Sequence, residues 1–291
     1  MGAPWVDHPA WEVVKRAEAG LGESLGDLLT SAPAETLART REAQLAVLLN
    51  SLVIWEALRP TLAHDVEIVA FAGHSLGQVT ALIAAGVLPL DDGVRLAATR
   101  AEVTQAAADR HPGKMAALLG ATEDQALDAC TAAPNACWVA NDNAPGQVVI
   151  AGTPEGLEAA SERARTIGIR KVMPLNVGGA FHTPLMGDAR DDLIPHLDKI
   201  TFAAPNSGVI SNIDGNAYSD GDAWRERLAD QLVRPVRWRA CMETIASLGA
   251  TSCLEVGRGE MLAGLAKRTT PDLPVRGVST PDDIPVDMEV H

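Results

Sequence analysis

The sequence of 291 residues has few cysteines, no long apolar run and no excess of positive charge. Its four cysteines show no Cys-x-x-Cys spacing, so we expect reduced thiols in the core of a cytoplasmic protein. No apolar segment reaches the roughly 20 residues that a membrane-spanning helix needs, and the N-terminus lacks a basic segment followed by an apolar one. A net charge of -14 argues against nucleic acid or an anionic membrane as partner.

The composition does supply a sizeable core. Apolar residues make up 47% of the chain, and the length allows one large domain with an insertion or two modest domains. Periodicity and turn residues predict helices over residues 8–20, 25–29, 40–58, 80–86, 89–108, 123–132, 154–166, 185–198, 223–232, 239–248 and 261–269. They predict strands over 66–70, 115–120, 137–140, 147–151, 170–177, 207–212 and 252–257. Thr40 is the expected N-cap of the long helix, residues 141–146 form a turn-rich loop, and the tail from Pro281 frays.

One stretch carries a chemical signal. Gly73-His74-Ser75-Leu76-Gly77 lies between the expected strand 66–70 and the helix that follows. A strand, Gly-x-Ser-x-Gly and a helix form the context of a nucleophile elbow, in which the tight turn needs glycines on both sides of the serine. Ser75 would be the nucleophile, and the Leu76 N–H would bind a developing oxyanion. The competing interpretation is a chance match in a chain rich in glycine and alanine.

The middle of the chain has a different order of predicted helices and strands. Residues 114–179 follow the order β-α-β-β-α-β, which is typical of a ferredoxin-like subdomain. We therefore expect an α/β protein whose larger domain, residues 1–113 and 180–291, has a mostly parallel sheet with helices on both faces, as in a hydrolase-like core. The smaller subdomain, 114–179, is inserted into it.

Six collinear segments now allow a comparison with a known family. They are Gly73–Gly77, Arg95–Arg100, Pro145–Gly152, Gly179–Met186, Gln231–Trp238 and Glu255–Gly259. In these segments the chain resembles malonyl-CoA:acyl carrier protein transacylase, the acyltransferase of fatty acid and polyketide synthesis. The resemblance covers nearly the whole chain and implies a coenzyme A thioester and an acyl carrier protein as partners. It implies no metal or other cofactor beyond the substrates, and we expect a monomer.

The resemblance also implies residue roles. Ser75 takes the acyl group, His182 is its general base, and Gln231 offers a carbonyl that orients His182. Arg100 holds the free carboxylate of the malonyl group. His74, Phe181 and Met186 line the acyl pocket, with Phe181 crowding branched groups.

From the residues alone, each role has a plainer alternative. Arg100 reads more simply as a helix-surface arginine. For Gln231, a polar residue on a helix surface is about as good an interpretation as the functional one, and core packing of Phe181 and Met186 is compatible with lining a pocket. Histidine suits the base because it titrates near neutral pH, and Gly178-Gly179 allow a close backbone approach before His182. Arginine suits a carboxylate because its planar fork binds both oxygens and stays charged.

The sequence departs from the family at two places. It begins without the strand and the Gly-Gln-Gly-Ser-Gln-like loop of the family, so we expect a central strand and a pocket glutamine to be missing. Backbone N–H and C=O groups of the neighbouring strand should then lack hydrogen-bond partners at that edge. Gln78 stands where many relatives carry glutamate, in the first helical turn, and should be tolerated. Carrier docking should use a local basic patch, with candidates Arg170, Lys171, Arg234, Arg237, Arg239, Lys267 and Arg268.

Two other functions stay open. A serine esterase or thioesterase would use the same elbow with an acid between serine and histidine, and the candidates are Asp91, Asp92, Asp109, Asp124, Asp128 and Asp142. A non-catalytic module that binds a carrier protein is the third reading. The residues do not separate fatty acid from polyketide synthesis, or either from the transacylase of a malonate decarboxylase complex.

Overall fold

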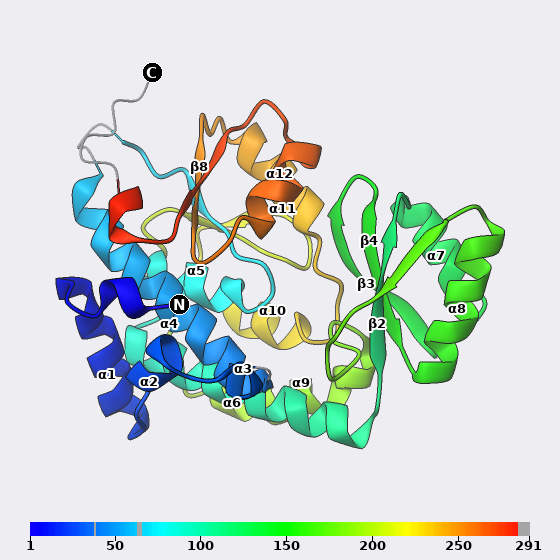
Figure 1. The fold of residues 1–291 in the computed structure, drawn as a ribbon, viewed down its shortest axis with the longest axis horizontal. Helices are drawn as coiled ribbons and strands as arrows, with labels where there is room; N and C mark the ends of the chain where they lie inside the picture. The colour runs from blue at the N-terminus through cyan, green and yellow to red at the C-terminus, as the bar shows by residue number, and fades with distance from the viewer. Residues whose placement is uncertain (38, 63–65, 285–291) are drawn as a thin grey trace.

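The computed structural model describes residues 1–37, 39–62 and 66–284 (Figure 1). Of the tail that we expected to fray, Pro281–Asp283 forms a 3-10 turn capped by Thr280, and 285–291 lie outside the described residues. A larger part carries most of the helices, and a sheet with two helices stands beside it (Figure 1). Among the described helices, none combines the length and apolar character that crossing a bilayer would require.

The first helices of the chain, α1 (Glu12–Leu21), α2 (Gly26–Thr30) and α3 (Ala34–Leu37), pack on one long apolar helix. This long helix is α4 (Thr40–Leu58). The bounds of α4 match the prediction, but the cap does not. Arg39 occupies the N-cap position without a side-chain bond, and the Thr40 hydroxyl donates instead to Gln105 at 2.6 Å.

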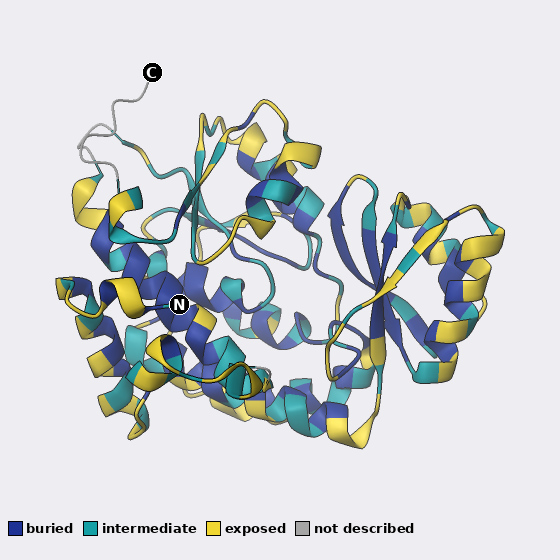
Figure 2. Ribbon diagram, in the orientation of Figure 1, coloured by how far each residue is buried: buried dark blue, intermediate teal, exposed yellow. Residues whose placement is uncertain are grey.

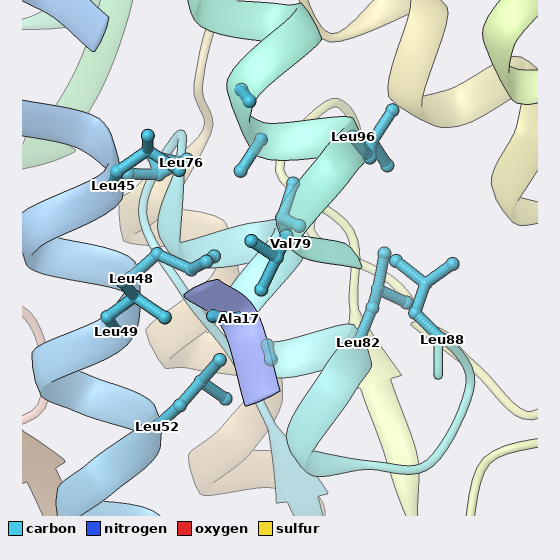
Figure 3. Packing of buried hydrophobic residues seen from close by; sticks show 14 of the residues in the cluster. Ala17, Leu45, Leu48, Leu49, Leu52, Leu76, Val79, Leu82, Leu88 and Leu96 are labelled. Carbon is cyan, nitrogen blue, oxygen red and sulfur yellow. The ribbon is translucent and has the colours of Figure 1, made fainter. Parts of the chain in front are cut away.

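Helix α4 is the centre of the main core. Its leucines pack against α5 (Gly77–Ala84), the helix that follows the elbow (Figure 3). The buried side chains of this part of the core include Leu45, Leu48, Leu49, Leu52 and Val79, and Leu82 lies on the side of α5 next to Leu88 (Figure 3). Because a fully buried leucine contributes about 1.5–3 kcal/mol to the stability of the fold, this contact holds α5, and with it the elbow, in place.

The larger part contains two small sheets rather than one continuous sheet. In the first, β1 (Ala70–Phe71) runs parallel to β6 (Gly208–Ile210), and β7 (Ala217–Tyr218) completes it antiparallel to β6. In the second, β8 (Cys253–Val256) pairs in parallel with β9 (Val275–Val278). The predicted strand 66–70 was wrong in its bounds. Only the two residues that face Gly208 and Val209 acquire strand pairing.

The larger part has further helices. They are α6 (Leu90–Arg110), α9 (Gly187–Leu197), α10 (Trp224–Asp230), α11 (Trp238–Ser247) and α12 (Met261–Thr269). Of these, α11 and α12 pack on the two sheets. Acidic Asp91 and Asp92 lie in the first turn of α6, where the helix dipole stabilises them. Helix α6 packs on α1, α4, α5 and α9, and it therefore links the elbow region to the rest of the fold. The expected α/β class is confirmed.

The smaller part has the predicted β-α-β-β-α-β order. Its elements are β2 (Lys114–Leu119), α7 (Glu123–Cys130), β3 (Cys137–Ala144), β4 (Gln147–Gly152), α8 (Pro154–Thr166) and β5 (Lys171–Pro174). All three pairings are antiparallel, in the order β3-β4-β2-β5, as a ferredoxin-like sheet requires. The residue bounds that we assigned to the two domains stay a prediction.

The two faces of this sheet bury different cores, because successive strand residues point to opposite sides. Ala116, Leu118 and Ile150 face α7 and α8, whose outer surfaces are exposed (Figure 2). Met115 and Ala117 belong to a separate cluster on the other face, together with Ala180, the residue two places before His182. The sheet thus presents an apolar face toward the segment that carries the histidine.

Strand β3 is longer than the sequence predicted. Residues 141–144, which we expected in a loop, continue the ladder with β4 through two register shifts. The extra residues at these bulges are Ala140 and Asn143, and bulges commonly re-aim side chains beside active sites. The Asp142 N–H also donates to the Val236 carbonyl at 2.9 Å. This contact ties the end of β3 to the larger part.

Candidate active site

Ser75 stands on a sharp turn between β1 and α5. Its φ of 52° lies in the left-handed region, which a non-glycine residue occupies only when its surroundings enforce it. A Cβ atom at Gly73 would overlap the backbone carbonyl of Gly77, so the turn requires glycine there. A Cβ at Gly77 would meet nothing within 4 Å. The expectation that sterics require both glycines is therefore wrong for Gly77.

Asn212, just after β6, clamps this turn. Its Oδ1 accepts the N–H of Ser75 at 2.8 Å, and its Nδ2 donates to the carbonyl of Gly73 at 2.9 Å. Its own backbone N–H donates to the Gln78 Oε1 at 3.0 Å. Gln78 is buried rather than on the helix surface, and its amide thus helps to fix the elbow. No sequence motif pointed to Asn212.

The structure brings His182 to Ser75 across 107 residues of sequence. The Nε2 atom of His182 lies 2.7 Å from the Ser75 Oγ, and Nδ1 lies 2.8 Å from the backbone oxygen of Gln231. A carbonyl can only accept, so Nδ1 carries the proton and Nε2 is free to accept the serine proton. His182 also has a left-handed φ of 61°. Both Ser75 and His182 thus have a backbone held in an uncommon conformation.

The environment of His182 keeps it neutral. Burial, followed by the positive charge of Arg100, lowers the pKa of His182 to about 3, although the carbonyl of Gln231 acts in the opposite direction. At neutral pH the imidazole is therefore unprotonated, as a general base must be. Within the residues that the structure describes, His182 forms no ion pair with a carboxylate.

Arg100 is buried next to the nucleophile. Its Nη2 donates to Ser75 Oγ at 3.1 Å and lies 3.5 Å from Gln231 Oε1, while Nη1 donates to Gln44 Oε1 at 2.7 Å. Burial lowers the pKa of Arg100 to about 10, so it stays charged at pH 7. It forms no ion pair with any described residue, and its Nε has no partner there. A buried cation without a counter-ion is a suitable site for an anionic ligand.

Gln231 acts through two groups. Its backbone carbonyl orients His182, as described above, and its side-chain Nε2 donates to the Ser75 carbonyl at 3.1 Å and to Asn212 Oδ1 at 3.0 Å. We predicted a helix through residue 232, but α10 ends at Asp230 and Gln231 is its C-cap. Ending the helix there leaves the carbonyl available to the histidine.

His74 is held by the bulged end of β3. Its Nε2 lies 2.8 Å from Asn143 Oδ1 and 3.4 Å from Asn141 Nδ2. Burial lowers the pKa of His74, so the ring is neutral, and the shorter contact places a proton on Nε2. Trp238 packs beside the ring, with centroids 5.6 Å apart. No pattern in the sequence linked these asparagines to the elbow, because they fell in an expected loop.

A cleft of about 400 Å³ opens over these groups. It lies between α4, α6, the elbow and the apolar face of the small sheet. Ser75, Leu76, Arg100 and His182 line it, as do the three predicted pocket residues His74, Phe181 and Met186. Val47 and Val177 also line it and are 48% and 41% exposed, which makes its outer part apolar.

The predicted oxyanion donor faces this cleft. Among the hydrogen bonds of the described residues, the Leu76 N–H donates to none, and α5 begins at the next residue. An N–H at a helix start, without a protein acceptor and beside the nucleophile, can bind a developing negative charge. The structure thus gathers every predicted site residue around Ser75. It adds Gln44, Asn141, Asn143 and Asn212, which the sequence analysis missed.

The arrangement suits acyl transfer through a serine ester. It offers a nucleophile, a neutral base, an oxyanion donor and a buried cation for a carboxylate. Asp142, one of the acids considered for a hydrolase triad, instead accepts from Arg239 at 2.7 Å. The histidine is thus oriented by a backbone carbonyl where a triad would use a carboxylate.

Comparison with known proteins points in the same direction. The family model described as acyl transferase domain matches residues 8–276. The malonyl CoA-acyl carrier protein transacylase of Escherichia coli is 36% identical over 281 residues, which cover 96% of this chain and 90% of that protein. The enzyme of the same name from Bacillus subtilis is 35% identical over 272 residues, or 92% of this chain and 84% of that protein.

Solved structures agree with the sequence relatives. A malonyl-CoA:acyl carrier protein transacylase from Xanthomonas oryzae pv. oryzae superposes with a TM-score of 0.91 at 37% identity, covering 97% of this chain and 91% of that one. A malonyl-transacylase solved in complex with a type II PKS acyl carrier protein superposes with a TM-score of 0.92 at 32% identity, covering 98% and 93%.

Proposed function

The chain belongs to the acyl transferase domain family, and we propose that it transfers a malonyl group from malonyl-CoA to the phosphopantetheine thiol of an acyl carrier protein. The transfer passes through a malonyl ester of Ser75. The observation that carries the malonyl preference is the position of Arg100, a buried cation that has no counter-ion among the described residues and whose Nη2 lies 3.1 Å from Ser75 Oγ.

The first half-reaction follows from the hydrogen bonds around Ser75. The hydroxyl oxygen attacks the thioester carbonyl while its proton moves to His182 Nε2, 2.7 Å away. The Leu76 N–H stabilises the negative charge on the carbonyl oxygen of the tetrahedral intermediate by donating a hydrogen bond to it. When the C–S bond breaks, the proton on His182 passes to the departing sulfur. Coenzyme A then leaves as a thiol.

The second half-reaction repeats these steps in reverse. The carrier thiol gives its proton to His182 and attacks the malonyl-serine carbonyl, and the proton returns to Ser75 Oγ as the C–O bond breaks. Over the two half-reactions one thioester is exchanged for another at little net cost, so this scheme uses no ATP and no cofactor beyond the two substrates. Water must be kept from the ester, and the apolar outer cleft with Val47 and Val177 serves that purpose.

Arg100 gives the site its preference among acyl groups. A malonyl carboxylate lies one carbon beyond the reacting carbonyl, so it falls near the guanidinium when the carbonyl is at Ser75. A charged, bidentate contact with a buried arginine is stronger than a neutral hydrogen bond, and an acetyl group forgoes it. Phe181 and Met186 limit the space around the carbon between the two carbonyl groups.

The surface that receives the carrier belongs to the same proposal. Three candidate cations already face acids: Arg234 near Asp230 at 3.8 Å, Arg237 near Glu123 at 3.2 Å, and Arg239 near Asp142. Among the described residues, Arg170, Lys171 and Lys267 are exposed and form no ion pair, so they are the first positions to test. A cytoplasmic location is part of this proposal too, and cell fractionation would test it.

A direct test is incubation with malonyl-CoA followed by intact-mass measurement. The wild type should gain one malonyl group and Ser75→Ala none. Adding a holo acyl carrier protein should remove the adduct from the enzyme and transfer it to the carrier. A folded wild type that gains no adduct would support the non-catalytic module instead. An adduct lost to water as fast as to the carrier would support the thioesterase.

A further inference from the structure

The shortest hydrogen bond of Arg100 is made with a residue that no motif identified. Its Nη1 donates to the Oε1 of Gln44 at 2.7 Å, compared with 3.1 Å from Nη2 to Ser75 Oγ. Gln44 lies in the second turn of α4, is half-buried, and lines the cleft together with Arg100. One terminal nitrogen of the guanidinium is thus held by a neutral amide, while the other faces Ser75.

We propose that Gln44 is a specificity-determining residue for the acyl group. It fixes the guanidinium of Arg100 so that Nη2 faces Ser75, and it contributes no negative charge of its own. The carboxylate of the substrate is then the group that neutralises Arg100. This inference rests on the proposed function, since it concerns how the same site selects malonyl over a neutral acyl group.

The neutrality of the amide is the central point. A hydrogen bond from Gln44 restricts the rotation of a long side chain that would otherwise have several orientations in the cleft. A glutamate at this position would keep the geometry but add a carboxylate at 2.7 Å from the guanidinium. Arg100 would then be neutralised within the chain, and a malonyl carboxylate would meet a second negative charge.

The packing of α4 on α6 holds Gln44 in place. Thr40 lies one turn before Gln44 on the same face of α4, and its hydroxyl donates to Gln105 of α6 at 2.6 Å. Two polar contacts, Thr40–Gln105 and Gln44–Arg100, therefore connect the same two helices. Gln105 does not line the cleft, so it offers a matched position for adding a charge without touching Arg100.

The test compares acyl preference among variants. Initial rates of Ser75 acylation by malonyl-CoA and by acetyl-CoA would be measured by intact mass for the wild type, Gln44→Glu, Gln44→Ala and Gln105→Glu. In Gln44→Glu the malonyl-to-acetyl ratio should fall by about ten- to hundredfold, the value of a hydrogen bond to a charged group. Gln44→Ala should shift the ratio less, in the same direction. Gln105→Glu should leave it unchanged.

A purely structural role for Gln44 would lower both rates together and leave the ratio at the wild-type value, and that result would overturn the inference. If Gln44→Glu does not fold, as judged by thermal melting, an unchanged ratio in Gln44→Ala decides against it. Failure of the proposed function looks different, because the wild type itself would then carry no malonyl adduct.

Discussion

The Nδ1 atom of His182 lies 2.8 Å from the backbone oxygen of Gln231, so the proposed base is oriented by the main chain. A backbone carbonyl carries only a partial charge and stabilises a protonated imidazole less than a carboxylate would. Burial, followed by the charge of Arg100, keeps the pKa of His182 well below its ordinary value, and the contact with the carbonyl of Gln231 offsets only part of this shift. A base of this kind favours a leaving group that takes its proton readily, as a thiolate does.

Replacing Gln231 should therefore cost much less than replacing His182. In Gln231→Ala the carbonyl remains, and the side-chain bonds to Ser75 and Asn212 and the 3.5 Å contact with Arg100 are lost. We expect malonyl loading to slow by no more than about tenfold, whereas His182→Ala should slow it by about 100- to 10,000-fold. Stopped-flow loading followed by intact mass would measure both. Equal losses in the two variants would show that the Gln231 side chain itself orients the base.

Removing the buried cation should change selectivity more than reactivity. Arg100→Ala should reduce malonyl loading by about a hundredfold, because the carboxylate loses a charge-assisted, bidentate partner. Acetyl loading should change far less. Arg100→Lys keeps the charge but loses the fork, so it should recover only part of the malonyl preference. The ratio of the two initial rates is the measurement, and a ratio unaffected by Arg100→Ala would rule out the carboxylate contact.

The two elbow glycines should differ sharply when replaced. Gly73→Ala places a Cβ against the backbone of Gly77, which cannot move without opening the turn. We expect a loss of about 1–3 kcal/mol or more in the free energy of unfolding, with little acylation of Ser75. Gly77→Ala has open space and should melt no lower than the wild type. Thermal melting of the matched pair checks this, and a similar destabilisation in both would refute it.

Asn212 should be essential to the elbow although it touches no substrate. In Asn212→Ala, the N–H of Ser75 and the Nε2 of Gln231 lose the side-chain oxygen that accepts from them, and the carbonyl of Gly73 loses its donor. All three groups are held in a buried part of the protein. Unpaired buried polar groups cost about 1–3 kcal/mol each, so urea unfolding should show a large loss. The exposed Asn216→Ala, four residues later, is the control and should unfold as the wild type does. A stable, fully active Asn212→Ala would mean that the turn is held by other contacts.

Stability should decrease toward acid pH in a way that depends on His182. Its pKa is about 3 in the folded protein and 6.5 ordinarily, so between these values the unfolded chain binds a proton that the folded chain does not. The free energy of unfolding therefore falls as pH drops through this window and is fully recovered above about 6.5. The lowered pKa of His74 acts in the same direction.

Urea unfolding at three pH values of about 7.5, 6 and 5, which span the ordinary pKa of histidine, would measure this effect. His182→Asn suits the test because asparagine tolerates the left-handed φ at this position. The variant should lose less stability than the wild type as the pH falls. The exposed His196→Asn should keep the wild-type dependence. Parallel curves for the wild type and His182→Asn would contradict the prediction.

Much of the fold was predictable because its signals are local. Periodicity and turn residues placed α4, α8 and α12 at or near their observed bounds, and the alternation of elements identified the β-α-β-β-α-β order. The strand at 66–70 and the loop at 141–146 were misjudged, since pairing partners far away in sequence decide which residues join a sheet.

The sequence by itself identified Ser75 as the candidate nucleophile, since the order of strand, Gly-His-Ser-Leu-Gly and helix is contained in consecutive residues. Only the tertiary structure decided what surrounds it. Asn212 reaches Ser75 across 137 residues, and Gln44 reaches Arg100 across 56. Such contacts leave no local pattern, because they depend on how α4, α6 and β6 pack around the elbow. The positions of His182, Arg100 and the residues that hold them are therefore decided by tertiary packing.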